Sequence, residues 1–510
     1  MMAIRNSRLP FLATFTLLVS AVGLPAQILH LERTGGTLGK PLNITVSGDS
    51  GQIWLLLPSF HRGPTPLRLF DPRDPRSLSI GMDMFLFFAL GSTSTGATVV
   101  PVALPNLPSM HGGTIHFQAF AVPGKNSIFG ALSNPISSIM GTQFHWAGKK
   151  ALLKTARVYP SVSPLIPGKL FLVAGGTGGK VAMPPFGLSS TEIYRGDPQD
   201  FVKGPKMAVA RVMHTASSLG FGRVLMAGGV NANGLVTKTC EIFDLGKGVF
   251  LSTGSLAVPR AGHRAVTLPD GRVIVIGGTS DVSTTLKALG AMLKTTEIYN
   301  PSTGTWTAGP SLPAPIAGNG AVLLPNGKVL ITGGVVLGAT NLPGNSTACY
   351  LFDPKTNTIS TAASLPFATA LHSATVLKSG RVLVAGGGAL TALITNSGAH
   401  GKAALYDPTL NTWTTLTPMT QVRAGHEAVL LKDGRVLLAG GYQGTLFAPK
   451  AIPGTVFFDP TTKSFAAGNP MPEARALNGT AVLATGQVLM FGGVGGTLGT
   501  PLDSGVFLFF

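Results

Sequence analysis

The residues with the clearest chemical potential are arginines and histidines that recur in a fixed pattern along the chain. In the commonest form an arginine is followed by a histidine three residues later, and three other units keep only one of the two. The set consists of Arg211, His214, Arg260, His263, His372, Arg423, His426 and Arg475. A guanidinium group offers forked donors to a carboxylate or a sulfate, and an imidazole donates or accepts a hydrogen bond. Gathered at one surface, these side chains would bind an anionic or polyhydroxylated ligand.

A Gly-Gly pair that follows a short apolar run shows what must position these side chains. The seven pairs end at Gly176, Gly229, Gly278, Gly334, Gly387, Gly441 and Gly493. Their spacing of 49 to 56 residues indicates supersecondary units that must stack to bury their apolar faces. Each of the first six units contains four candidate strands: one at the R-x-x-H group, the run before Gly-Gly, a Glu-Ile-Tyr-like run and a run with Trp or another large apolar residue. A repeat of four short strands is typical of a propeller blade.

These units resemble the kelch family, in which Gly-Gly, a downstream Tyr and a downstream Trp recur. The sequence therefore predicts an all-β protein with a seven-bladed kelch-type β-propeller at 142–510. The last unit ends after its third strand, near Phe507. Because an open ring would leave an unpaired edge strand and an apolar blade face in water, we expect Thr142–Trp146 to close the seventh blade.

In an up-and-down blade the first strand lies nearest the axis, so the R-x-x-H groups are expected around one mouth of the propeller. A second interpretation stays open. Because the same residue types recur in many blades, the arginines can instead secure each blade by binding main-chain carbonyls or Glu192, Glu241 and Glu297 of the third strands. The long loop of the third unit is also expected to contain a short helical turn within Ser283–Lys294.

The N-terminal part lacks this repeat. Residues 1–26 contain Arg5 and Arg8 before an apolar stretch and are interpreted as a signal peptide, which predicts a secreted or periplasmic protein with no membrane span after its removal. Residues 28–140 contain alternating apolar runs separated by Gly, Pro and Ser, which predicts a β-sandwich of unknown role.

Composition narrows the class of protein further. The chain has 510 residues, 45% of them hydrophobic, with 67 Gly and 38 Pro distributed along it, which excludes a disordered protein and indicates many tight turns. The net charge is +18, and 142–510 carries 29 basic and 15 acidic residues. Such a charge attracts a protein, an anionic glycan or an envelope surface. We do not expect nucleic acid as the partner.

The same architecture, a secreted β-sandwich followed by a seven-bladed kelch propeller, is similar to galactose-oxidase-like copper enzymes. This resemblance implies that the copper ligands, if the chain had them, would include a Tyr-His pair within an R-x-Tyr-His segment. This chain has Met213 before His214, and Tyr159 is followed by Pro160. Neither pair supplies the phenolate oxygen and imidazole nitrogen together. No copper ligand is carried over, and no catalytic residue, metal site or cofactor is predicted.

Two cysteines occupy equivalent positions in blades two and four. Because blade three lies between them, Cys240 and Cys349 are expected to be too far apart for a disulfide and to remain free and buried. The sequence thus favours a non-catalytic binding or interaction module for anionic or carbohydrate ligands. An extracellular carbohydrate-active enzyme is the alternative.

Overall fold

The computed structural model describes most of the chain after the predicted signal peptide, which lies outside the described residues. The described residues are 29–35, 37–38, 40–48, 53–60, 62–66, 76–80, 89–93, 97–104, 110–111, 114–122, 132–140, 145–149, 152–179, 184–196, 199–337, 343–388, 398–444, 449–496 and 499–509. The chain divides into two compact units, one made of 1–33, 43–102 and 114–137 and the other of 34–42, 103–113 and 138–510.

The strands before residue 140 form small sheets. A three-stranded sheet contains β1 (His30–Thr34), β2 (Pro41–Ser47) and β7 (Ala97–Ala103), and a four-stranded sheet contains β6 (Ala89–Ser92), β3 (Ile53–Ser59), β8 (Thr114–Val122) and β9 (Ile136–Ile139). β4 (Arg62–Pro66) pairs with β5 (Ser77–Ile80). Leu42, Ile44 and Val46 alternate with more exposed residues along β2, which is the pattern of a strand with one buried face.

The rest of the chain forms seven four-stranded sheets, which we number as blades one to seven with their strands given from the axis outward. Blades one to three are β11 (Ser161–Ile166), β12 (Leu170–Ala174), β13 (Thr191–Arg195) and β14 (Asp200–Lys203); β15 (Thr215–Gly220), β16 (Arg223–Ala227), β17 (Cys240–Asp244) and β18 (Val249–Ser252); and β19 (Arg264–Thr267), β20 (Val273–Ile276), β21 (Thr296–Asn300) and β22 (Thr305–Ala308).

Blades four to seven follow the same antiparallel order. They are β23 (Gly320–Leu323), β24 (Val329–Thr332), β27 (Cys349–Asp353) and β28 (Thr358–Ala362); β29 (Ser373–Val376), β30 (Val382–Ala385), β31 (Ala403–Asp407) and β32 (Thr412–Leu416); β33 (Glu427–Leu430), β34 (Val436–Ala439), β37 (Thr455–Asp459) and β38 (Ser464–Gly468); and β39 (Gly479–Val482), β40 (Val488–Phe491), β43 (Gly505–Leu508) and β10 (Trp146–Lys149).

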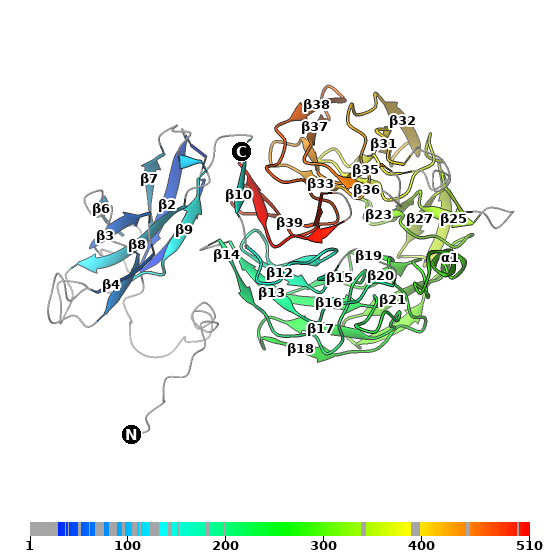
Figure 1. Ribbon diagram of the computed structural model, residues 1–510, viewed down its shortest axis with the longest axis horizontal. Coiled ribbons are helices and arrows are strands. Elements are labelled where there is room, and N and C mark those ends of the chain that lie inside the picture. Colours follow the sequence, from blue (N-terminus) through cyan, green and yellow to red (C-terminus); the bar gives the residue numbers. More distant parts are fainter. Residues whose placement is uncertain are drawn as a thin grey trace, which may run out of the picture. The chain divides into compact units, whose positions relative to one another are not determined.

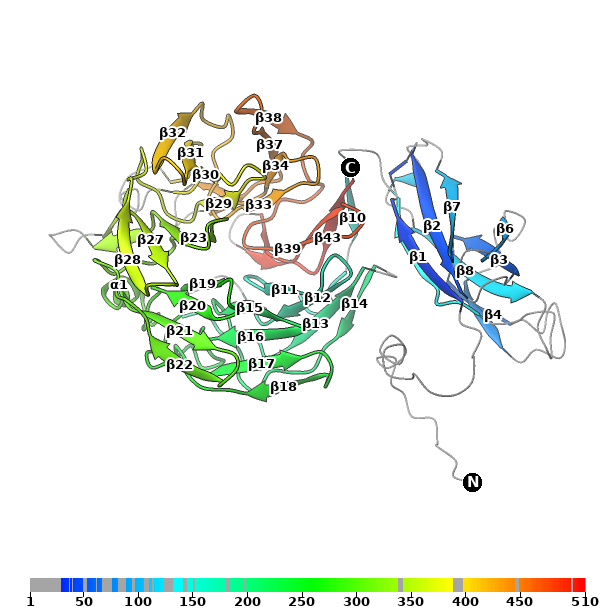
Figure 2. The ribbon, with the colours of Figure 1, turned by 180° about the vertical axis from the view of Figure 1, so that it is seen from behind.

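The first strands of the blades form the inner wall of the ring. Neighbouring first strands contact one another from β11 through β15, β19, β23 and β29 to β33, and β39 contacts β11. Figures 1 and 2 show these strands around the centre of the ring from both sides. The predicted all-β fold with a seven-bladed propeller is therefore confirmed.

The seventh blade is closed by chain from both ends of the propeller, as the sequence predicts. In the ladder between β10 and β43, Trp146 pairs with Leu508, Ala147 with Phe507 and Gly148 with Val506. The closing strand begins at Trp146 and runs to Lys149, later than the predicted Thr142–Trp146, and 142–144 lie outside the described residues. The indole Nε1 of Trp146 donates to Asn469 O of blade six at 3.1 Å.

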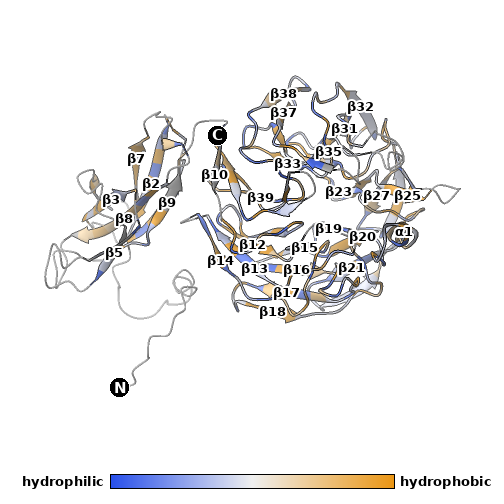
Figure 3. Cartoon of the chain, viewed as in Figure 1, coloured by the Kyte–Doolittle hydropathy of each residue, from blue (hydrophilic) through white to orange (hydrophobic). Residues whose placement is uncertain are grey.

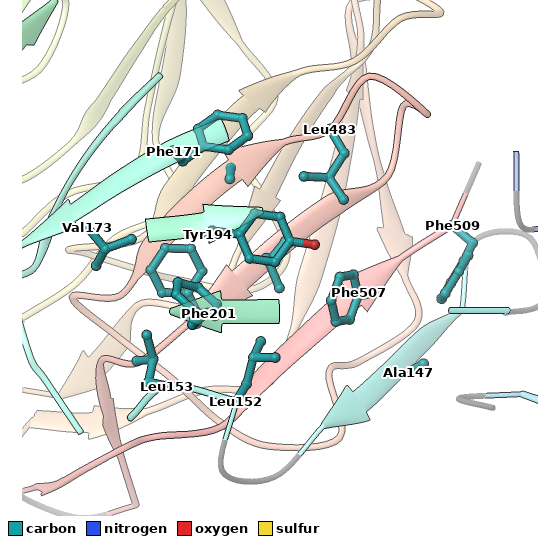
Figure 4. Close-up of a cluster of buried hydrophobic side chains, with 13 residues drawn as sticks. Ala147, Leu152, Leu153, Phe171, Val173, Tyr194, Phe201, Leu483, Phe507 and Phe509 are labelled. Carbon is teal, nitrogen blue, oxygen red and sulfur yellow. The ribbon is translucent and has the colours of Figure 1, made fainter. Parts of the chain in front are cut away.

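Between neighbouring blades lie the hydrophobic cores of the propeller. The cluster between blades seven and one contains Phe171, Tyr194, Phe201 and Phe507, all buried (Figure 4). Hydrophobic residues, orange in Figure 3, lie along strands throughout the ring. Every residue of the second strands β20, β24, β30, β34 and β40 is buried. Burial of apolar area at these interfaces is the main stabilising contribution, at roughly 25 cal/mol per Å².

The connections carry little further regular structure. The helical turn expected in blade three is α1 (Thr285–Gly290), capped by the Thr284 side chain. Three short ribbons, β25 (Val335–Leu337) with β26 (Pro343–Asn345), β35 (Tyr442–Gly444) with β36 (Pro449–Ala451) and β41 (Val494–Gly495) with β42 (Thr500–Pro501), extend other loops. No helix in the described part of the chain combines the length and the hydrophobicity that crossing a bilayer requires.

Candidate functional site

The repeated arginines lie inside the blades, where each is fully buried. In blade two, Arg211 Nη1 donates to Gly228 O at 2.8 Å and to Thr239 O at 2.7 Å, while Nη2 donates to Glu241 Oε1 at 2.9 Å. The equivalent arginines bind the first Gly of their own Gly-Gly pair in the same way. These are Arg157, Arg260, Arg423 and Arg475, each with 0% of its surface exposed.

A buried glutamate completes this arrangement in the first three blades. Glu241 Oε1 and Oε2 also accept hydrogen bonds from the backbone N–H groups of Val209 and Ala208, at 3.1 and 2.7 Å. The same pattern joins Glu192 to Arg157 and Glu297 to Arg260. The arginine and glutamate therefore tie the third strand to the loop that enters the first strand. Of the two interpretations of the arginines, this geometry matches the structural one, because no guanidinium reaches the surface.

The four predicted histidines connect neighbouring blades through their Nε2 atoms. His214 Nε2 lies 2.8 Å from Ser161 Oγ of blade one, and His263 Nε2 lies 2.9 Å from Thr215 Oγ1 of blade two. His372 and His426 make the same contact with Thr332 Oγ1 and Ser373 Oγ. Burial lowers the pKa of His214 and of His372 to about 3, so both imidazoles are neutral at ordinary pH.

The Gly-Gly pairs complete the connection between blades. In blade two, Gly228 and Gly229 adopt φ of +61° and +94°. A Cβ atom at Gly228 would collide with the carbonyl oxygen of Arg260 in blade three, and Gly229 N donates to that oxygen at 2.8 Å. The conformation and the close approach both exclude larger residues here.

Just before each first strand, a residue with positive φ contributes to what we call the entrance ring. Its members are Tyr159, Met213, Gly262, Gly318, Leu371, Gly425 and Leu477, with φ between 54° and 63°. Backbone hydrogen bonds run around this ring, for example from Gly262 N to Met213 O at 2.8 Å and from Tyr159 N to Leu477 O at 2.9 Å. Non-glycine residues in this conformation cost about 1–3 kcal/mol each, and such residues cluster at functional sites.

Inside the entrance ring the first strands surround the axis of the propeller, and we call the space along this axis the axial channel. All four residues of β29 are partly exposed, whereas all four of its neighbour β30 are buried. Because β29 belongs to the innermost wall, its partial exposure indicates a space along the axis that water reaches. The side chains that this wall presents decide what the channel binds.

Two opposite charges, Arg264 and Glu427, stand at the start of first strands in blades three and six. Arg264 Nε donates to Asn319 O at 2.7 Å. Burial raises the pKa of Glu427 to about 7, although the Arg264 charge and a hydrogen bond with Thr480 act against this rise. Burial also lowers the pKa of Arg264, which is nevertheless exposed by surface area. The lowered pKa and the exposed surface of Arg264 together indicate a side chain that water reaches but that other residues closely surround.

The Arg264 charge reaches other residues around the entrance. Burial raises the pKa of Tyr159 to about 12, with Arg264 acting in the opposite direction. Tyr159 packs against two apolar clusters, one with Met213 and one with Leu477 and Tyr442. The candidate site therefore combines an apolar entrance with one cation and one anion below it.

Sequence reasoning missed Arg264 and Glu427, although the aligned repeat contains a signal for them. The residue after the histidine position is small in the other five blades, where it is Ser161, Thr215, Gly320, Ser373 and Gly479. The blades that follow Arg264 and Glu427 also carry Asn319 and Asn478 in place of histidine. A residue that departs from the repeat is a better candidate for a ligand site than one that recurs.

The residues present do not fit the copper site of galactose-oxidase-like enzymes. His214 and its neighbours use Nε2 to contact hydroxyl groups of the preceding blade, and Met213 stands where a tyrosine ligand is required. Among the described residues no three His, Cys, Asp or Glu side chains are grouped so that they could hold a metal ion.

Comparison with known proteins agrees with the architecture. Residues 199–449 match the family model described as the Attractin/LZTR1 β-propeller. A solved structure described as a fungal alcohol oxidase of the AA5 family in complex with copper matches at 18% identity and a TM-score of 0.53, over 71% of this chain and 76% of that chain. At this identity the match shows the fold alone. No curated protein matches the chain. The repeat, the seven closed blades and the family match together show that the chain folds as a kelch-type β-propeller.

Proposed function

We propose that this protein is a secreted or periplasmic, non-catalytic binding module that takes a carbohydrate or anionic ligand at the entrance of the axial channel. The observation that carries the proposal is the pair Arg264 and Glu427, which interrupts an otherwise repeated wall with two opposite charges. The eight arginines and histidines of the repeat serve this function indirectly, because they hold the wall in place.

The chemistry of the entrance supports such a ligand. Arg264 has two terminal NH₂ groups that donate to carboxylate, sulfate or hydroxyl oxygens. Glu427 accepts from sugar hydroxyls, and the partly buried faces of Tyr159, Met213 and Leu477 supply apolar contact. Pockets that combine an apolar lining with a few fixed polar groups are typical of small-molecule sites.

The net charge of 142–510 supports an anionic partner such as an acidic glycan or an envelope surface. A positive surface raises the rate at which a polyanion associates, and this effect weakens as salt is added. A protein partner would bind to the loops between the strands of the propeller.

The proposal is tested by binding the purified protein to a panel of neutral and acidic oligosaccharides. We expect R264Q to weaken binding of the best ligand at least tenfold, because a charge-assisted hydrogen bond is lost. The control is R272Q, since Arg272 lies in the turn between β19 and β20 and pairs with Asp270. Equal affinity of R264Q and R272Q, or no binding by the unaltered protein, would refute the proposal.

A further inference from the structure

We infer that the axial channel recognises a ligand that carries a carboxylate and an ammonium group together. Arg264 would bind the carboxylate and Glu427 the ammonium. This inference rests on the proposed function and narrows its ligand class to molecules with both charges, such as an amino acid or an amino-sugar acid.

The two side chains come from opposite parts of the wall at the same level. In the strand ladders Arg264 pairs with Ile276 and Glu427 with Ala439, so each is the first paired residue of its blade. Blades four and five separate them on one side of the ring, and blades seven, one and two separate them on the other. Both charges therefore border the same channel from facing sides.

Arg264 differs from the repeated arginines in how it is bonded. Arg211 directs its terminal nitrogens to two carbonyl oxygens, a threonine hydroxyl and Glu241. Among the described residues, the single side-chain hydrogen bond of Arg264 uses Nε and ends on Asn319 O. No ion pair within 4.0 Å joins Arg264 to Glu427 in the described part of the chain. The terminal NH₂ groups are thus available to a ligand.

Partial desolvation of both groups explains why paired charges are preferred. Burial raises the pKa of Glu427 and lowers that of Arg264, so burial disfavours the charged form of each group, although the two charges partly stabilise each other. A carboxylate on Arg264 and an ammonium on Glu427 replace lost hydration with charge-assisted hydrogen bonds. A ligand with one charge forms a charge-assisted hydrogen bond with one wall residue only and leaves the other partly desolvated group without such a bond, which is unfavourable in a buried site.

The residues at the same level of the other blades are all small. Gly320, Ser373 and Gly479 stand at this position in blades four, five and seven, and Ser161 and Thr215 in blades one and two. None carries a long side chain that could reach across the axis. Apolar residues of the entrance ring, including Met213 and Leu371, would cover the methylene groups of a bound chain.

A series of ω-amino carboxylates tests the inference, because chain length sets the separation of the two charges. 4-Aminobutyrate, 5-aminopentanoate and 6-aminohexanoate are titrated into the protein by calorimetry at constant ionic strength. Hexanoate and hexylamine serve as matched ligands with one charge each. We expect at least one amino carboxylate to bind tenfold or more tightly than both. Equal affinity for hexanoate and for the best amino carboxylate would overturn the inference.

Charge reversal in the protein provides the matched variants. R264E and E427R each place two like charges in the channel and should lose binding at least tenfold. The double variant R264E/E427R restores opposite charges in the reverse order and should recover most of the loss. R272E, at the opposite end of blade three, should bind like the unaltered protein. Thermal melting of each variant identifies any that fail to fold, and a folded double variant without recovery contradicts the inference.

The outcomes also separate this inference from the proposed function. If oligosaccharides bind in a manner that depends on Arg264 while no amino carboxylate binds, the inference fails and the proposed function stands. If neither kind of ligand binds, both fail.

Discussion

At the scale of single residues, side chains that recur in many blades have a different role from side chains that occur in only one blade. Arg211 recurs in equivalent form in other blades, is buried, and is bonded to groups that recur with it. Arg264 occurs once, stands at the start of an innermost strand and has one side-chain hydrogen bond among the described residues. Recurrence therefore marks residues that hold the blades, and departure from recurrence marks candidate ligand contacts.

The buried ion pair Arg211–Glu241 should be costly to break from one side. R211A leaves Glu241 buried with no cation, and we expect a loss of about 3–5 kcal/mol in the free energy of unfolding. Adding E241Q should recover part of this loss, because the uncompensated charge is removed. Urea denaturation of the single and double variants measures both effects. A loss under 1 kcal/mol in R211A would contradict the structural role assigned to the arginines.

Glu427 should make stability depend on pH. Its pKa is about 7 in the folded protein against an ordinary value of 4.5, so the folded state holds the proton more tightly than the unfolded state. The contribution of Glu427 to the free energy of unfolding is complete below pH 4.5 and is lost as the pH rises to about 7. The contribution is on the order of 1–3 kcal/mol.

The measurement compares the unfolding free energy of the unaltered protein with that of E427Q at several pH values. The variant should gain stability relative to the unaltered protein between pH 4.5 and 8, and the difference should be flat above pH 8. Other titrating groups, including the buried histidines, cancel in the difference. A difference that does not change with pH would show that Glu427 keeps its ordinary pKa.

At the scale of single elements, the sequence predicts the strands well because their signals are local. The ten-residue spacing from Trp413 to Arg423 recurs in other units, and Trp413 pairs with Tyr406 across the outer ladder, with ring centroids 5.0 Å apart. Boundaries are less accurate. The closing strand was expected at Thr142–Trp146 and runs from Trp146 to Lys149, because its limits are set by pairing with β43, far away in sequence.

Trp146 should report the strength of this closure. It is buried against residues of blades six and seven and its indole donates to Asn469 O. We expect W146A to lower the free energy of unfolding by about 3–5 kcal/mol, the usual cost of truncating a buried aromatic residue. Deleting 146–149 should have a larger effect, with aggregation, since it exposes the edge of β43. Soluble deletion protein with an unchanged melting temperature would refute the closure.

At the scale of the whole molecule, the sequence predicts the closed ring of blades but not which of the repeated side chains are buried. Aligning seven units places each R-x-x-H group at one end of a blade, and the structure confirms that the loops meet there: Arg211 N, for example, donates to Leu188 O. Whether an arginine at that end is buried or accessible depends on bonds across the blade, such as the one to Glu241. Arg264 and Glu427 are not predicted as site residues because a single Arg or Glu at the start of a strand is common, and only the aligned repeats show that the other blades carry small residues at this position.

The two cysteines should report whether the blades stay together. Cys240 and Cys349 are free and buried, as the sequence predicts, and burial raises the pKa of each thiol to about 11. The folded protein should therefore react with less than 0.1 equivalent of a thiol reagent in an hour, and with two equivalents after denaturation. Mass spectrometry of alkylated, unreduced protein counts the labels. Rapid labelling of the folded protein would show that the blades separate readily.

The pairing of β10 with β43 has a consequence for biosynthesis. The two partners are separated by more than 350 residues, so a growing chain exposes the apolar side of β10 until almost the entire propeller has been made. A circularly permuted chain that begins at Leu152 and carries 146–149 after Phe510 and a short Gly-rich linker would place both partners in one hairpin, since Trp146 pairs with Leu508 and the turn needs at least two residues. Such a rearranged chain should acquire its native contacts sooner after synthesis, with less need for chaperones, while its folded form stays the same.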